Sequence, residues 1–169
     1  MLGVYEHFPI NIHKITIFSA SVPSKKLQQM LTKTLSKMNK ENFSSEDIAI
    51  QSLSQCTVIF ESGIAEANNF NYLDEEETNK ALKAIQKKPL QIMDFFCALR
   101  YYKIQNEKKT SLKFDYYMMR FIFNKDLMEM QVFHEKGPRY VSPEDITRFI
   151  ADRINKASSK KMLKAPEKP

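Results

Sequence analysis

The stretch LQIMDFFCALRYYKI, Leu90–Ile104, is apolar at both odd and even positions for most of its length. A strand with one face in water alternates apolar and polar side chains, whereas a strand covered on both faces does not. The pattern therefore predicts a central β-strand. We expect a helix or a partner subunit to cover its second face.

Two more strands follow the central one. A lysine-rich turn, Asn106–Thr110, leads to an alternating stretch at Leu112–Phe123, and a short polar turn at residues 124–126 leads to Leu127–Glu135. Strands joined by such short turns pair in an antiparallel manner. The three strands therefore predict an antiparallel meander. We expect most of its many aromatic side chains in the core, and the rest at an interface or against nucleic-acid bases.

Helices and strands alternate before and after the meander. Strands are expected at His13–Val22 and Gln55–Glu66, from their period-two alternation. Helices are expected from Ser24, with this serine as N-cap, at Asp74–Lys88, and after Ser142-Pro143. The polar connections are expected at residues 39–47 and 67–72.

The resulting order is β-α-β-α-β-β-β-α. It favours an α+β domain of two layers, in which helices pack on a mixed, mostly antiparallel, five-stranded sheet. The length of 169 residues suits one domain, which we place at residues 1–155. Residues 156–169 contain five lysines among alanine, serine and proline, and we expect them to form a basic, disordered C-terminal tail.

Composition excludes several classes of function. Three glycines in the whole chain cannot supply the clustered glycines of a Walker A or dinucleotide-binding loop. The three histidines and two cysteines lack zinc-ligand spacing, so we expect no metal and no cofactor. No apolar stretch approaches the length of a membrane span, and no signal-like segment is present. We expect a soluble protein of the cytoplasm or nucleus with no membrane partner.

The net charge of +6 is unevenly distributed along the chain. The segment from Ser24 to Lys40 carries five lysines and no acid, the first of them Lys25. Four fall within about 60° of one another at about 100° per residue, namely Lys26, Lys33, Lys37 and Lys40. Like charges so placed repel one another. The stripe therefore indicates an acidic partner such as a phosphate backbone; a lysine face that is merely solvated is the alternative.

A second basic segment precedes the last helix. Lys136 and Arg139 lie near the start of that helix, where a phosphate or carboxylate can be received. Glu144 and Asp145 already occupy the first turn and repel an anion. We keep both basic residues as candidate nucleic-acid-binding residues; a simple turn between strand and helix is the alternative.

Carboxylates on the predicted strands are candidate catalytic groups. Asp94 interrupts the central strand, and Asp115 and Glu135 lie on the two strands that follow. If the three converged, they could hold a divalent ion for phosphodiester cleavage. The alternative is a structural pair between Asp94 and Arg120.

Cys97 and His134 are a candidate nucleophile–base pair. Cys97 lies in the central strand and His134 in the last strand of the meander, and such pairs meet only in the folded protein. We favour Cys97 as a core residue instead.

These observations favour a non-enzymatic subunit or adaptor that docks on other macromolecules in a nucleic-acid-handling assembly. The lysine stripe would bind RNA or DNA, and the aromatic, methionine-rich meander would form a second docking surface. One alternative is a self-associating or partner-docking protein that binds no nucleic acid. The other is a metal-dependent phosphodiesterase that uses the strand carboxylates.

Overall fold

The computed structural model describes residues 1–48, 50, 53 and 55–165, and within them the chain forms three helices and nine strands. The helices are α1 (Ser24–Met38), α2 (Glu75–Lys87) and α3 (Pro143–Lys156). The longer strands are β1 (Lys14–Ala20), β3 (Cys56–Glu66), β5 (Ile92–Gln105), β7 (Asp115–Asn124) and β8 (Leu127–Lys136). The shorter strands are β2 (Asn42–Ser44), β4 (Asn69–Tyr72), β6 (Lys108–Ser111) and β9 (Leu163–Lys164).

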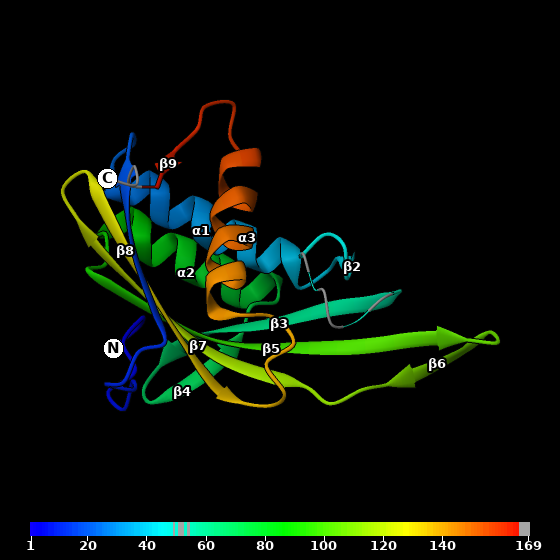
Figure 1. Cartoon of the computed structure of the whole chain (residues 1–169). Coiled ribbons are helices and arrows are strands. Elements are labelled where there is room, and N and C mark those ends of the chain that lie inside the picture. The colour runs from blue at the N-terminus through cyan, green and yellow to red at the C-terminus, as the bar shows by residue number, and fades with distance from the viewer. Residues whose placement is uncertain (49, 51–52, 54, 166–169) are drawn as a thin grey trace.

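One sheet joins the nine described strands in the order β2-β3-β5-β7-β8-β1-β9, with β4 beside β3 and β6 beside β5. The described pairings are all antiparallel. The three helices lie on one side of this sheet (Figure 1). The α+β class is therefore confirmed. The expected mixed, five-stranded sheet is wrong, because four short strands extend it and the described pairs are antiparallel.

Two of the short strands belong to hairpins with tight two-residue turns. Ala67 and Asn68 both have positive φ, 51° and 63°, as do Asn106 and Glu107, 50° and 64°. Two consecutive residues in the left-handed region match the right-handed twist of the flanking strands. The segments expected as loops at 67–72 and 106–110 therefore form β4 and β6 instead. β2 similarly lies within the polar connection expected at 39–47.

The basic tail is ordered for most of its length. β9 pairs with the end of β1, and Met162 and Leu163 are each 1% exposed. The side-chain oxygen of Asn155 accepts hydrogen bonds from the backbone N–H groups of both residues, each at 2.9 Å. The expectation of disorder after Lys156 is therefore wrong up to Ala165; residues 166–169 lie outside the described residues.

Of the two serines expected as N-caps, Ser142 is confirmed and Ser24 is not, while Asp74, expected as the first residue of its helix, is the N-cap of α2. The side chain of Ser142 caps α3, and that of Asp74 caps α2, by accepting bonds from Asp145 and Glu77 N–H. α1 begins at Ser24, but Pro23 occupies its N-cap position, so the expected serine cap is wrong. Among the described residues, no helix is long and apolar enough to cross a membrane.

β5 lies at the centre of the sheet and contributes to both faces. Its side chains on the helix side enter the core, which includes the buried residues Phe60, Phe95, Leu99, Tyr101, Tyr117, Phe121, Leu31, Leu35, Ile85 and Ile150. On the second face, one end is covered by the N-terminal segment, which lies across the sheet from the helices (Figure 1). Gly3 N–H donates to Ala65 at 2.7 Å, and Asp94 N–H donates to Gly3 at 2.6 Å. This segment, rather than a helix, covers that end of the second face.

Candidate functional site

The lysine stripe lies on the solvent side of α1. Helical spacing buries Leu27, Leu31 and Leu35 against the sheet. The opposite side then carries the exposed lysines Lys26, Lys33 and Lys37, with the exposed Lys40 in the turn just after the helix, while Lys25 is half-buried. None of these five lysines forms an ion pair with any residue that the structure describes. The stripe is therefore an uncompensated positive surface.

Some of the cations on the other two helices have carboxylate partners, although Lys83, Lys87 and Lys156 form no ion pair among the described residues. Lys80 of α2 lies 2.6 Å from Glu66. Arg153 of α3 forms two hydrogen bonds to Glu41, at 2.8 and 2.9 Å. The lack of acid on α1 is thus a feature of this helix rather than of the whole helical layer.

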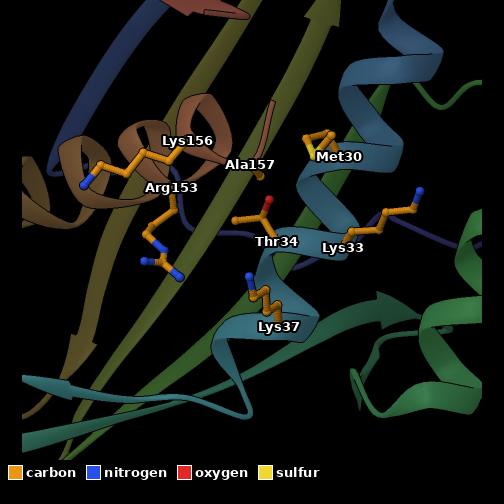
Figure 2. A pocket seen from close by; sticks show the side chains of 7 residues that line it. All are labelled: Met30, Lys33, Thr34, Lys37, Arg153, Lys156 and Ala157. Atoms are coloured by element: carbon orange, nitrogen blue, oxygen red, sulfur yellow. The ribbon is translucent and has the colours of Figure 1, made fainter. Parts of the chain in front are cut away.

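A hollow of about 370 Å³ separates α1 from the C-terminal half of α3. Its lining includes Met30, Lys33, Thr34 and Lys37 of α1, together with Arg153 and Lys156 of α3. Figure 2 shows the Lys33 and Lys156 side chains extending away from each other at opposite rims. Sequence reasoning did not include Arg153 and Lys156, because only packing of α3 beside α1 brings them to the stripe.

A second hollow continues the basic surface toward the start of α1. It has a volume of about 430 Å³ and is lined by Pro23, Lys25, Lys26, Gln29, Met30 and Lys33. Met30 and Lys33 line both hollows, so the two are adjacent along the helix. Four of the five predicted lysines, Lys25, Lys26, Lys33 and Lys37, therefore border one elongated, shallow surface, whereas Lys40 follows the end of α1 and lines neither hollow.

Lys136 and Arg139 lie elsewhere. They are exposed at the N-terminal end of α3, whereas the α1 lysines lie beside its C-terminal end, and a helix of 14 residues is about 21 Å long. The backbone N–H of Asp145, in the first turn, already donates to Ser142. The structure therefore does not bring these two residues together with the stripe.

The strand carboxylates do not converge. Asp94 lies on the face away from the helices, where it forms two hydrogen bonds of 2.8 Å with Arg120 and accepts Tyr5 N–H at 2.7 Å. This confirms the structural pair between Asp94 and Arg120. Asp115 lies on the helix side, and Glu135 is exposed. Within the described residues, no three His, Cys, Asp or Glu side chains are placed to hold a metal ion. The three carboxylates expected to hold a divalent ion are therefore not brought together.

Asp115 is instead the centre of a buried polar cluster. Its carboxylate accepts from the Tyr101 hydroxyl at 2.6 Å and from Arg139 and Tyr140 N–H at 2.6 and 2.9 Å, and it lies 2.8 Å from His134 Nε2. The cluster requires a glycine at position 137, where φ is 114°, since a Cβ there would lie 2.2 Å from the Phe114 carbonyl oxygen. The cluster fixes the loop before α3.

Cys97 is a core residue. It is fully buried, and burial raises the pKa of its thiol to about 12. His134 is engaged by Asp115 rather than by this thiol. A nucleophile–base pair of Cys97 with His134 is therefore not formed.

The aromatic side chains of the meander divide between the two faces of the sheet. Phe95, Tyr101, Tyr117, Phe121 and Phe123 are buried on the helix side. Phe96, Tyr102, Phe114, Tyr116 and Phe133 are half-buried on the other face. The second set is accessible to a partner.

Comparisons of the chain with protein-family models, with curated proteins and with solved structures found no match.

Proposed function

We propose that this protein is a non-enzymatic docking subunit that binds the phosphate backbone of RNA or DNA through the lysines of α1. The observation that carries the proposal is the exposure of Lys26, Lys33, Lys37 and Lys40 on one side of a helix without acid, unpaired by any described residue. Holding such charges together costs free energy in the isolated protein. A polyanion that releases its counterions on binding offsets this cost.

The shape of the surface supports a backbone contact rather than a small-molecule site. The two hollows along α1 are shallow and adjacent, and lysines border both of them, from α1 alone in one hollow and from α1 and α3 in the other. Lysine ammonium groups on flexible stems contact phosphates as point charges and do not read base sequence. We therefore expect binding that is strongly salt-dependent and weakly sequence-dependent.

The test measures the affinity for labelled RNA and DNA oligonucleotides by fluorescence anisotropy over a range of about 50 to 200 mM salt. The double substitution Lys33→Gln/Lys37→Gln should reduce the slope of log K against log salt by about 1.8 on duplex DNA, since each phosphate contact contributes about 0.9. The matched control is Lys14→Gln/Lys125→Gln, which removes the same charge from β1 and the β7–β8 turn. Absence of binding at low salt, or equal slopes in the two variants, overturns the proposal.

Self-association is a second candidate, favoured by one observation. Ile15, Ile17 and Leu127 are 53%, 47% and 44% exposed, and all three lie on the sheet face opposite the helices. An exposed apolar cluster of this kind is typical of an interface. Light scattering at increasing protein concentration tests it, with Ile17→Ser as the variant that should dissociate a dimer. A wild-type protein that stays monomeric at high concentration excludes self-association.

A further inference from the structure

Four aromatic rings follow one another across the sheet face that the helices leave uncovered. The ring centroids of Phe70 and Phe96 are 5.6 Å apart, and those of Phe96 and Tyr116 are 5.4 Å apart. Phe114 continues the row at 6.5 Å from Tyr116. These four residues, which we name the aromatic strip, come from β4, β5, β7 and the segment just before β7. Their half-buried side chains form a continuous surface that no described part of the chain covers fully.

Three residues of the aromatic strip, Phe70, Phe96 and Tyr116, line a hollow of about 260 Å³. Two small residues, Gly63 and Ala98, form part of its lining, and Tyr72 lies beside it with 48% of its surface exposed. A Cβ at Gly63 would lie 2.9 Å from the Asn71 carbonyl oxygen, so the glycine permits β4 to approach β3 and bring Phe70 and Tyr72 to the strip. Flat groups can therefore reach the aromatic surface from solvent.

Positive charge adjoins the aromatic strip at one end. The guanidinium carbon of Arg100 lies 4.5 Å from the centroid of the Phe114 ring. Nε of Arg100 lies 2.5 Å from Oε1 of Glu61, so the charge of the Glu61 carboxylate at the hollow is neutralised. Beyond it, the β5–β6 hairpin extends past the helices (Figure 1). Residues 103–113 of this hairpin contain one acid, Glu107, and four lysines, namely Lys103, Lys108, Lys109 and Lys113. Lys109 lies 4.2 Å above the ring of Tyr102.

We propose that this face binds single-stranded RNA or DNA, with unpaired bases stacked on the aromatic strip and phosphates along the β5–β6 hairpin. Aromatic rings beside a basic track are the combination that single strands require, because each base offers a π-face and each linkage a charge. A duplex hides its base faces and cannot stack in this way. The inference rests on the proposed function, but it uses the opposite face of the sheet from α1.

The chain contains no tryptophan, which allows a direct test of stacking. Tyr72→Trp, at a half-exposed position beside the strip, places a single indole at the hollow. Its fluorescence should be quenched on addition of an oligothymidine or oligouridine of about 12 nucleotides, and not by a duplex of the same length. Lack of quenching at saturating single strand overturns the proposal.

Affinity measurements assign the contacts. Tyr116→Leu should weaken single-strand binding about tenfold, whereas Phe133→Leu, an aromatic position on the same face but outside the strip, should leave it unchanged. Lys108→Gln/Lys109→Gln should lower the single-strand salt slope by about 1.4, since each contact contributes about 0.7. Circular dichroism of each variant establishes that it is folded. Equal affinities of the Tyr116 and Phe133 variants overturn the proposal.

The outcome also separates this inference from the function of α1. If Lys33→Gln/Lys37→Gln weakens duplex binding while the Tyr72→Trp indole is not quenched by single strands, the sheet-face proposal is wrong and the α1 proposal stands. If the indole is quenched and the α1 variant behaves as its control, the sheet face alone binds nucleic acid. A dimer that Tyr116→Leu dissociates, in a protein that binds no oligonucleotide, assigns this face to a second copy of the chain and overturns the proposal.

Discussion

Nε2 of His134 lies 2.8 Å from Oδ1 of Asp115, and both side chains lie beneath the loop that enters α3. The same carboxylate accepts the Tyr101 hydroxyl and two backbone N–H groups of that loop. Burial raises the pKa of the Tyr101 phenol well above its ordinary value, and the adjacent carboxylate adds to this, so the phenol stays a neutral donor. The fully buried Asp115 carboxylate is thus hydrogen-bonded through both of its oxygens.

Asp115→Asn should therefore destabilise the fold by about 2–4 kcal/mol, because an amide offers one acceptor oxygen where four donors converge and turns its NH₂ toward two of them. Urea unfolding measures the change. Asp126→Asn is the control, since Asp126 is exposed in a turn at φ 63°, a conformation that asparagine adopts readily. An Asp115 variant as stable as this control contradicts a structural role for the cluster.

Arg120→Ala should destabilise the protein by about 2–3 kcal/mol, because it leaves the buried Asp94 carboxylate without its cation. This value lies at or below the lower limit of about 3 kcal/mol for a fully buried pair, because the arginine side chain is 22% exposed. Arg100→Ala is the matched control: its partner Glu61 is 39% exposed, so the loss should be about 1 kcal/mol or less. Denaturant midpoints of the two variants provide the comparison.

The same substitution should also loosen the N-terminal segment. Asp94 accepts Tyr5 N–H, and Arg120 donates to the Tyr5 carbonyl at 3.2 Å. Phe8 lies with its ring 4.4 Å from the Arg120 guanidinium carbon. Limited proteolysis should cut the first 10 or so residues faster in Arg120→Ala than in Arg100→Ala. Equal cleavage rates would show that the pair does not hold this segment.

His13 should make stability fall in mild acid. Burial, together with the nearby Arg139 and His134, lowers the pKa of His13 below its ordinary value. The unfolded state therefore binds more protons than the folded state near pH 6. The contribution of neutral His13 to the free energy of unfolding is fully present above the unfolded-state pKa and is lost as pH falls through the folded-state pKa. The backbone N–H of His134 also donates to Nδ1 of His13 at 2.9 Å, and Nδ1 can accept this bond only while the His13 ring is neutral.

The urea midpoint should therefore fall between about pH 7.5 and pH 5.5 in the wild type. His13→Gln should show a smaller fall. His7→Gln, at another exposed histidine of the same segment, should follow the wild type. Parallel curves for all three proteins would exclude His13 as the source.

Periodicity in the sequence was sufficient for the long elements and insufficient for the short ones. β5 was readable because its residues are apolar on both faces, and the helices because their apolar residues recur at helical spacing. β4 and β6 depend on tight turns at Ala67-Asn68 and Asn106-Glu107, whose left-handed backbone no apolar pattern reports. β9 was hidden in a lysine-rich segment, where Asn155 anchors Met162 and Leu163.

The candidate site shows the same division. The lysine stripe follows from spacing along one helix, so the sequence contained it. The separation of Asp94 from Asp115 depends on register: Asp94 pairs with Arg120, and Asp115 is five residues from Arg120, which places it on the other face. His134 pairs with Tyr117 on the helix side and lies beside Asp115, whereas Glu135, the expected partner, is the extra residue of the bulge between Tyr116 and Tyr117. Neither relationship is local in sequence.

Cys56 and Cys97 are both free, and they should differ in reactivity in the folded protein. Burial raises the pKa of both thiols, that of Cys97 to about 12, so neither is appreciably a thiolate at neutral pH. Cys56 begins β3, whereas Cys97 lies in the middle of the central strand with no exposed surface. Local opening at a strand end costs less free energy than opening the core.

Iodoacetamide should therefore label Cys56 first and Cys97 only at the rate of global unfolding, as measured by mass spectrometry of the peptides. In urea above the unfolding midpoint both should react at one rate, and labelling of native Cys97 as fast as Cys56 would contradict its place in the core.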